Sequence, residues 1–271
     1  MALTAFQRRI CRLLADHRIA SGESYVAGGV ALNELIGAPR RSDDIDLFHD
    51  ADEALEASWE ADRALLLAER FEVELLRERP FLVEAHVRHG GESTLMQWAR
   101  DSAYRYFPLV EHPDLGLVLL HPFDLATNKV LALVGRLEVR DWVDVIECDT
   151  RIQSLGYLAW AACGKDPGFS PTAILEHATR SARYTAEEVS SLAFEGEAPD
   201  PGELSRRWHR QLDDAQRIVA TLPAQEVGKC VLDTDGGLCR STLDELPAAL
   251  DRGEIRFHPG SLRGALATPT T

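Results

Sequence analysis

The sequence lacks a long hydrophobic run, since no stretch of about 18 apolar residues occurs anywhere in its 271 residues. It therefore predicts no membrane-spanning helix. The first segment, residues 1–20, is interrupted by four arginines and an aspartate, so it predicts an amphipathic helix rather than the apolar block of a signal peptide.

Cysteine motifs are also absent from the sequence. The five cysteines are odd in number and scattered, and no C-x-x-C occurs. This pattern argues against a disulfide framework and against a zinc ribbon. It favours a reducing compartment, which predicts a cytoplasmic location.

Basic residues are scarce relative to acidic ones. The chain has 29 Lys and Arg against 44 Asp and Glu, which gives a formal net charge of −15. Proteins that coat DNA or RNA without sequence preference present a basic surface, so general nucleic-acid binding is excluded. A local basic patch on an acidic body remains compatible with this charge.

The composition is that of a globular protein, with 45% hydrophobic and 27% charged residues. Its patterning changes along the chain and predicts an α+β fold. Residues 1–115 alternate short apolar runs with helical stretches, which predicts a lobe built on a mixed α/β sheet. Residues 116–222 predict a helical lobe. Residues 223–271 predict a β-hairpin, turning at Asp235-Gly236-Gly237, and a C-terminal tail.

A glycine pair stands between a predicted strand, residues 24–27, and a predicted helix, residues 30–36. Exposed N–H groups and the helix dipole favour anions at a helix N-terminus, and glycine allows close approach to the backbone. Gly28 and Gly29 are therefore candidates for binding the phosphates of a nucleotide. Taken alone, such a pair is equally typical of an ordinary turn.

Two aspartates alternate with apolar residues on the next predicted strand, residues 44–48. The period of two places Asp44 and Asp46 on one face and directs Ile45 and Leu47 into the core. Adjacent carboxylates repel each other unless a cation lies between them, and Mg²⁺ prefers oxygen ligands. The pair predicts a site for Mg²⁺ or Mn²⁺, although the pair alone is also typical of a solvated strand face.

A second polar group lies in the predicted helical lobe. Lys129 and Arg136 are seven residues apart on the predicted helix 122–137, so they share a face. The compact ammonium of Lys129 suits a triphosphate, and Asp141 on the next predicted helix can pair with a neighbouring cation. The same spacing is also typical of a helical hairpin with surface ion pairs.

The ordered arrangement of strand, Gly-Gly, helix, turn and Asp-x-Asp resembles the signature of DNA polymerase β-type nucleotidyltransferases. With the second polar group included, the sequence resembles the AbiEii/AbiGii family, which includes the MenT proteins, nucleotidyltransferase-like toxins of toxin–antitoxin systems. The resemblance covers about residues 24 to 150. Four blocks match in the family order: Gly28, Gly29, Ala31 and Leu32; Ser42, Asp44, Ile45, Asp46 and Leu47; Asp124, Leu125, Ala126, Lys129, Ala132, Leu133 and Arg136; Arg140, Asp141 and Asp144.

This resemblance implies a two-lobed nucleotidyltransferase fold with the nucleotide and metal in a cleft between the lobes. It implies an enzyme that moves an NMP from an NTP, its co-substrate, to an acceptor such as a tRNA end or a protein. A cognate antitoxin protein is an implied partner. The implied site residues are Asp44 and Asp46 for the metal; Gly28, Gly29, Ser42 and Arg41 or Arg40 for the β and γ phosphates; Lys129 for the triphosphate; and Asp141, which would orient Lys129 or act on the acceptor.

The sequence departs from the superfamily pattern at two positions. Many relatives have Gly-Ser where this chain has Gly28-Gly29, so Ser42 or backbone amides must take the place of that hydroxyl. The superfamily also uses a third carboxylate on a later strand, where this chain has Gln97. Asp101 shares the face of Gln97, but about 13 Å further along an extended strand, so it can serve as the third acid only if the strand is shifted in register.

Two other functions fit the same residues. A net charge of −15 suits a small cationic acceptor, as in an aminoglycoside-like nucleotidyltransferase, better than it suits tRNA. Because Gln97 stands where the superfamily has its third carboxylate, a nucleotide-binding module without catalysis also fits the sequence.

Overall fold

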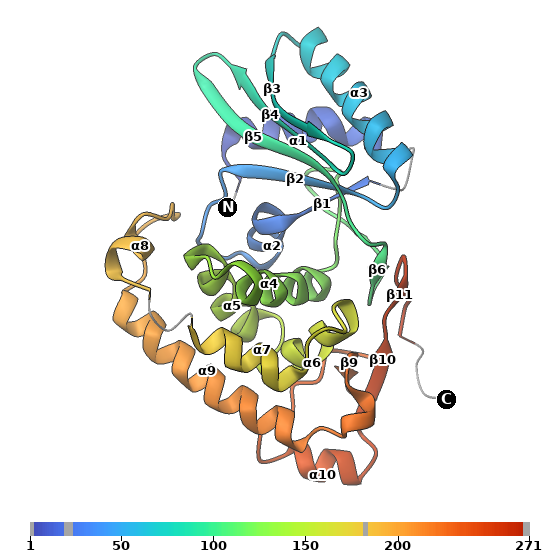
Figure 1. Ribbon diagram of the computed structural model, residues 1–271, viewed down its shortest axis with the longest axis vertical. Helices are drawn as coiled ribbons and strands as arrows, with labels where there is room; N and C mark the ends of the chain where they lie inside the picture. Colours follow the sequence, from blue (N-terminus) through green and yellow to red (C-terminus); the bar gives the residue numbers. More distant parts are fainter. Residues whose placement is uncertain (1–2, 19–23, 181–183, 268–271) are drawn as a thin grey trace. The chain divides into compact units, whose positions relative to one another are not determined.

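The computed structural model describes residues 3–18, 24–180 and 184–267, and the chain divides into two compact units (Figure 1). The first comprises Met1–Ala103 and Leu109–His121, and the second comprises Tyr104–Pro108 and Pro122–Thr271. The first unit extends past residue 115, the expected boundary, because Val118–Leu119 forms a strand of its sheet. The segment 223–271 belongs to the second unit, and its last residues, 268–271, lie outside the described residues.

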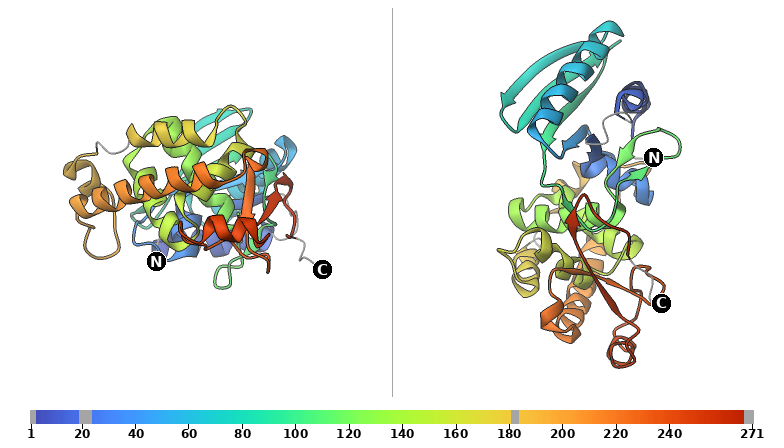
Figure 2. Two further views of the ribbon diagram at one scale, coloured as in Figure 1. Left: turned by 90° about the horizontal axis from the view of Figure 1, so that it is seen from below. Right: turned by 90° about the vertical axis from the view of Figure 1, so that its right-hand side faces the viewer.

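A seven-stranded mixed sheet forms the centre of the first unit (Figures 1 and 2). Strand β1 runs antiparallel to β2 and parallel to β8, while β2 and β5 are parallel to each other. The other neighbours, β3 with β4, β4 with β5 and β7 with β8, are antiparallel. In order across the sheet, the strands are β3 (Glu72–Arg79), β4 (Leu82–His89), β5 (Glu92–Arg100), β2 (Asp44–His49), β1 (Ser24–Ala27), β8 (Val118–Leu119) and β7 (Val110–Glu111).

The two faces of this sheet differ in burial. Along β2, buried and half-buried residues alternate, so Ile45 and Leu47 lie in the core while Asp44 and Asp46 occupy the other face. Helices α1 (Ala5–Arg18) and α3 (Asp52–Ala68) pack on the core face. The indole N–H of Trp98 on β5 donates to Asp62 of α3 at 2.7 Å, which satisfies a buried polar group on that face.

Helix α2 (Gly28–Ile36) begins directly at the end of β1. No side chain caps its N-terminus, and its first residue, Gly28, has a left-handed φ of 69°. At its other end Gly37 adopts φ 62°, the left-handed conformation that commonly ends helices at glycine. The helix is therefore bounded by two glycines that both need a conformation rare for other residues.

The second unit is mainly helical. The predicted helices over residues 122–137 and 140–155 are confirmed in type, and they are joined by Leu137 in a left-handed conformation. Its helices are α4 (Pro122–Arg136), α5 (Val139–Arg151), α6 (Leu155–Lys165), α7 (Pro171–Ala178), α8 (Ala186–Ser190), α9 (Pro201–Thr221), the 3₁₀ helix η2 (Ala224–Glu226) and α10 (Leu246–Asp251). Among the helices of the described residues, none combines the length and the apolar character needed to cross a bilayer.

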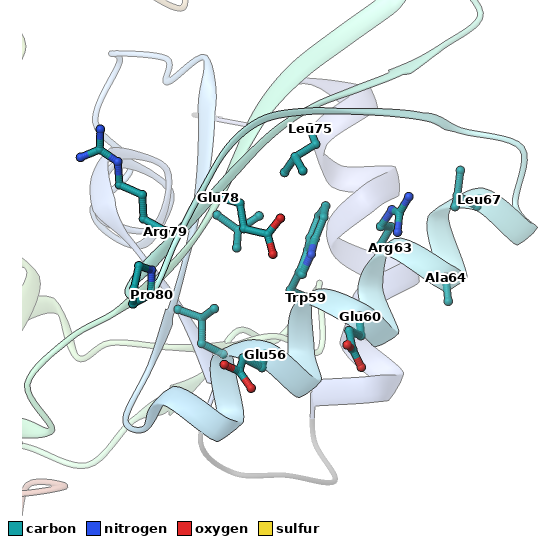
Figure 3. A pocket seen from close by; sticks show the side chains of 12 residues that line it. Glu56, Trp59, Glu60, Arg63, Ala64, Leu67, Leu75, Glu78, Arg79 and Pro80 are labelled. Carbon is teal, nitrogen blue, oxygen red and sulfur yellow. The ribbon is translucent and has the colours of Figure 1, made fainter.

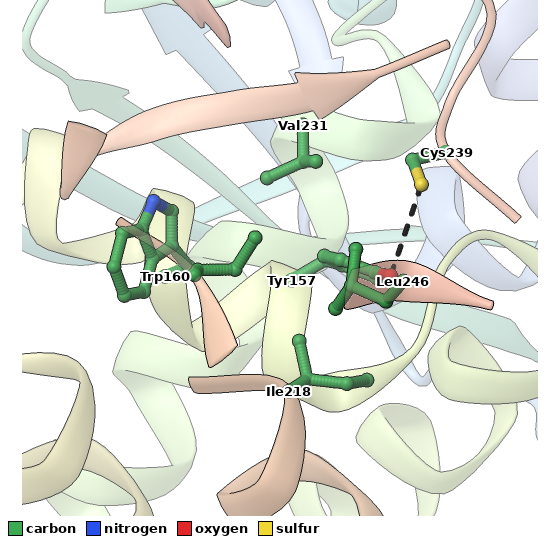
Figure 4. Close-up of a cluster of buried hydrophobic side chains, with 7 residues drawn as sticks. Tyr157, Trp160, Ile218, Val231, Cys239 and Leu246 are labelled. Atoms are coloured by element: carbon green, nitrogen blue, oxygen red, sulfur yellow. Dashed lines mark hydrogen bonds between the residues drawn. The ribbon is translucent and has the colours of Figure 1, made fainter. Parts of the chain in front are cut away.

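The C-terminal part of the second unit packs on α6 and α9 through a buried apolar cluster (Figure 4). This cluster joins Tyr157 and Trp160 of α6 to residues that are far away in sequence, including Val231 and Leu246. The tail is thus part of the hydrophobic core of the unit, which explains why it does not form a separate body.

The expected β-hairpin turning at Asp235-Gly236-Gly237 is only partly formed. Its first arm is β9 (Lys229–Leu232), but its second arm contributes a single bridge, Leu232 to Leu238. β9 forms its main ladder with β10 (Arg256–Pro259), and β11 (Ser261–Leu262) pairs with β6 (Tyr104–Arg105). The turn signal was local, whereas β10 is a distant segment whose pairing depends on the tertiary core.

The segment Tyr104–Pro108 is held in the second unit by Asp124. This fully buried carboxylate accepts hydrogen bonds from the N–H groups of Tyr106, at 2.9 Å, and Phe107, at 3.1 Å. Lys165 forms an ion pair with Asp124 at 2.8 Å. Asp124, one of the residues that carry the family resemblance, is therefore satisfied by contacts within the fold.

Candidate active site

In the candidate site, the carboxylate of Asp46 lies beside the backbone of a glycine. The register of β1 and β2 places Ala27 opposite Asp46, so Gly28 follows directly beside the Asp46 side chain. A Cβ atom added to Gly28 would overlap Asp46 Oδ2. The carboxylate thus lies against the first residue of α2, where the helix dipole favours a negative charge.

The second glycine lies against two polar side chains of the following loop. A Cβ atom on Gly29 would lie 2.5 Å from a guanidinium nitrogen of Arg40 and 3.1 Å from Ser42 Oγ. Both side chains are buried. The Ser42 hydroxyl donates a hydrogen bond to Asp44 Oδ1 at 2.5 Å, and this fixes the orientation of that carboxylate.

The loop that carries Ser42 is anchored from the core face of the sheet. The amide of Gln7 on α1 donates to the Ser42 carbonyl at 2.9 Å, and the Thr94 hydroxyl of β5 donates to the Asp43 carbonyl at 2.9 Å. The loop is therefore held by side chains from two separate elements. The position of the Ser42 hydroxyl is set by this anchoring as well as by its own bond to Asp44.

The two arginines of the loop occupy different environments. Arg40 packs against Gly29 and donates through Nη1 to the carbonyl of Arg41 at 2.8 Å. The Arg41 side chain is exposed. The structure thus places Arg40 beside the glycine pair, whereas Arg41, the other arginine expected to bind phosphate, lies on the surface.

A row of polar side chains crosses the sheet from Asp46. Asp46 pairs in register with Gln97 on β5, and Gln97 pairs with Glu84 on β4. Gln97 Nε2 donates to Glu84 Oε1 at 3.1 Å, and Arg77 on β3 forms an ion pair with Glu84 at 3.1 Å. Local sequence patterns did not identify Glu84 as a neighbour of the site, because only strand pairing shows that it shares the face of Asp46.

Asp101 lies beyond the end of β5, and its N–H donates to the carbonyl of His49 at 3.0 Å. Since Asp46 is level with Gln97, a strand rise of about 3.3 Å per residue puts Asp101 about 13 Å further along. There is no register shift in the β2–β5 ladder that would bring it closer. Within the described ranges, no group of three or more His, Cys, Asp or Glu side chains is arranged to hold a metal, which leaves Asp44 and Asp46 as a pair.

The second unit contains a compact network around Lys129. The Lys129 ammonium lies 3.0 Å from Asp141 Oδ1 and 3.0 Å from Asp144 Oδ2, and both carboxylates are fully buried. Arg136 adds two hydrogen bonds to Asp141, at 2.6 and 2.9 Å. The Lys129 ammonium is therefore held between two buried carboxylates, and the side chain does not lie on an exposed helix face.

The environment of Asp141 favours its ionised form. Burial by itself would raise the pKa of this carboxyl, but the hydrogen bonds from Arg136 and the charge of Lys129 outweigh burial. The pKa of Asp141 is lowered as a result. The carboxylate stays charged and keeps Lys129 and Arg136 oriented on it.

Three solved structures share this fold at low sequence identity. MenT4, a nucleotidyltransferase toxin from Mycobacterium tuberculosis H37Rv, is 15% identical with a TM-score of 0.51, and the match covers 80% of this chain and 84% of that chain. JHP933 from Helicobacter pylori is 15% identical with a TM-score of 0.50, and the match covers 80% of this chain and 92% of that chain. A further nucleotidyltransferase structure from H. pylori is 14% identical with a TM-score of 0.50, covering 82% and 99%.

No protein-family model and no curated protein sequence matches this chain. The expected fold is therefore supported by structure rather than by sequence similarity. The chain has a MenT-like nucleotidyltransferase fold, with a mixed sheet and a helical region, as its motifs predict.

Replacing Gly28 by alanine is expected to destabilise the protein more than replacing Gly37. Both glycines have a left-handed φ, which costs an alanine about 1–2 kcal/mol. A Cβ at position 28 also overlaps Asp46, whereas nothing lies within 4 Å of a Cβ at position 37. Thermal and urea unfolding of Gly28→Ala and Gly37→Ala measure the difference. Equal losses in the two variants would contradict the close contact.

Replacing Asp141 by asparagine is expected to weaken the pH dependence of stability. Because the folded pKa is lowered, ionised Asp141 stabilises the protein fully above about pH 5, and this contribution is lost as the pH falls towards the folded pKa. Near neutral pH, the variant should lose about 3–5 kcal/mol, since a buried ion pair is broken. Urea unfolding of both proteins from about pH 7 to pH 3 should show this difference shrinking. A constant difference would be inconsistent with a lowered pKa.

Proposed function

We propose that this protein is a metal-dependent nucleotidyltransferase that moves an NMP from an NTP to an acceptor. The observation that carries the proposal is the packing of the Asp46 carboxylate on Gly28, beside the bond from Ser42 to Asp44. It combines a helix N-terminus suited to phosphate with two carboxylates on one strand face, in a chain with a nucleotidyltransferase fold.

The donor set of the first unit fits a magnesium ion. Mg²⁺ is commonly bound by one or two protein carboxylates, while substrate phosphates and water complete its shell. Asp44 and Asp46 supply two carboxylates on the half-buried face of β2. A metal held there, Mg²⁺ or Mn²⁺, would supply positive charge to neutralise the phosphates during transfer.

The residues around the glycine pair would bind the triphosphate. Backbone N–H groups at Gly28 and Gly29 and the guanidinium of Arg40 would face the β and γ phosphates, and the Ser42 hydroxyl would hold Asp44 in place. A hydroxyl oxygen of the acceptor would then bond to the α-phosphorus and give its proton to water or to a phosphate oxygen. The bond from the α-phosphorus to the bridging oxygen breaks, and pyrophosphate leaves with that electron pair. Positioning and charge stabilisation provide most of the rate, as in other phosphoryl transfers.

Lys129 would bind the negative charge of the triphosphate, and Asp141 would position its ammonium. Support comes from the network in which two buried carboxylates fix the direction of the Lys129 side chain. Arg136 holds Asp141 by two hydrogen bonds, so the lysine is oriented by a group that is itself fixed. Such preorganisation lowers the cost of placing a charge during the reaction.

We place the protein among toxin nucleotidyltransferases, with a tRNA end or a protein as acceptor and an antitoxin protein as partner. The support is the fold shared with MenT4, which is described as a nucleotidyltransferase toxin. The net charge of −15 favours a second candidate, transfer to a small cationic acceptor of the aminoglycoside kind.

Labelled NTPs identify the acceptor directly. The wild-type protein is incubated with each α-labelled NTP and Mg²⁺, together with purified tRNA, bulk protein or an amine-rich antibiotic. Label in the tRNA or protein fraction supports the toxin, and label on the antibiotic supports the small-molecule enzyme. Binding of NTP without label in any fraction would mean a non-catalytic nucleotide-binding module and would overturn the proposal.

Asp44→Asn and Asp46→Asn are each expected to lower the transfer rate by more than about a hundredfold, because either change removes a metal ligand. Asp101→Asn is the matched control. It removes a carboxylate from the same unit, but about 13 Å along the strand from the level of Asp46. Initial rates with saturating Mg²⁺ measure the effect. Near wild-type rates in either of the first two variants would sink the metal assignment, and a lost rate in the control would make Asp101 a catalytic acid.

Lys129→Ala is expected to weaken NTP binding by about tenfold or more, because an ammonium that pairs with phosphate is removed. Asp144→Asn provides the control, since it breaks one ion pair of Lys129 but keeps the ammonium. Calorimetric titration with a non-hydrolysable NTP separates binding from stability. If both variants lose stability and neither loses affinity, Lys129 has a structural role only.

A further inference from the structure

Strand β3 lies at one end of the sheet formed by the described residues. It pairs with β4 on one side, and nearly every residue along it is exposed. Proteins usually protect such an edge, because its backbone groups can pair with another strand. The exposed edge of β3 is therefore a candidate surface for pairing with another strand.

A bulge in β3 changes which side chains share a face. The register with β4 is regular from Glu72 to Leu75, then shifts between Leu75 and Arg77. As a result, four charged residues all lie opposite alternate residues of β4, which project from one face. These four are Glu72, Glu74, Arg77 and Arg79, partnered by Arg88, His86, Glu84 and Leu82 respectively.

The order of charges on this face is acid, acid, base, base. A strand of this kind complements a second copy of itself in antiparallel orientation, because each half meets the opposite charge. If the twofold axis lies between Leu75 and Leu76, Glu72 stands opposite Arg79 of the second copy and Glu74 stands opposite its Arg77. Without the bulge, the two arginines would lie on the other face and this match would be lost.

Apolar side chains gather along the same edge. Leu75 and Leu76 are 47% and 48% exposed, and nearby Leu67 and Phe81 are 49% and 58% exposed. A groove of about 800 Å³ lies between α3 and the β3–β4 hairpin, where Trp59 and Leu75 line it from the two sides (Figure 3). Covering these groups would remove apolar surface from water, which favours association.

We propose that two copies of this chain form a dimer by antiparallel pairing of β3 with β3, which joins their sheets into one. The proposal commits to a second copy because a twofold interface must be complementary to itself, and the charge order of β3 meets this condition. A foreign strand of uniform charge would be repelled by one half of β3. The interface lies in the first unit alone, and it does not depend on the proposed catalytic function.

The decisive experiment reverses the outer charges of the strand. Neither Glu72 nor Arg79 forms an ion pair within the part of the chain that the structure describes, so changing them leaves the neighbouring Arg77–Glu84 and Arg88–Glu74 pairs intact. Glu72→Arg or Arg79→Glu each creates two like-charge contacts in the dimer. The double variant Glu72→Arg/Arg79→Glu restores both pairs with the signs exchanged.

Sedimentation velocity from low micromolar to submillimolar concentration is expected to show a wild-type dimer. Each single reversal should weaken dimerisation by roughly tenfold or more, and the double variant should recover it. Glu92→Arg, at the start of β5, is the control and should remain dimeric. Circular dichroism and thermal unfolding check that all variants fold.

Three results would overturn the proposal. They are a wild-type protein that is monomeric over the whole range, a dimer that both single reversals leave unchanged, and a double variant that stays monomeric. Binding of a different protein to monomeric chain at this edge would likewise replace the second copy as the occupant.

Discussion

The contact between Gly28 and Asp46 is the constraint on which the candidate site depends. The β1–β2 register brings the second aspartate of β2 directly against the residue where β1 becomes α2. The helix can start there only if residue 28 has no side chain and can adopt a left-handed φ. The glycine at position 28 therefore allows α2 to start at this point and allows the Asp46 carboxylate to lie next to the helix N-terminus.

The second unit holds the ammonium of Lys129 in a buried environment. Removing Lys129, Asp141 and Asp144 from water costs several kcal/mol per ion, and replacing such a network by apolar side chains is often neutral or stabilising. Stability alone is therefore a weak reason for this arrangement. What the network does provide is a fixed position for one ammonium, since both carboxylates point to the same nitrogen.

Local patterns predicted most of the elements and the strand face that carries Asp44 and Asp46. Alternation along residues 44–48 correctly placed Asp44 and Asp46 on one face, and the glycines correctly marked the boundary of α2. Local patterns could not decide between Arg40 and Arg41, because the choice depends on how the loop packs on Gly29. The role of β10 as the partner of β9 was equally invisible, since that pairing joins segments separated by a helix.

The row from Asp46 to Arg77 shows how strand order, rather than sequence distance, sets the chemistry next to a site. An ionised carboxylate only accepts hydrogen bonds. The Gln97 amide therefore donates to Glu84 through its NH₂ group, and its oxygen points away from Glu84. Glu84 is held in turn by Arg77 on the edge strand. The amide of Gln97, the residue level with Asp46, is thus oriented by a row of contacts that extends to the edge strand of the sheet. These contacts join residues on three neighbouring strands, so they follow from strand pairing and not from closeness in sequence.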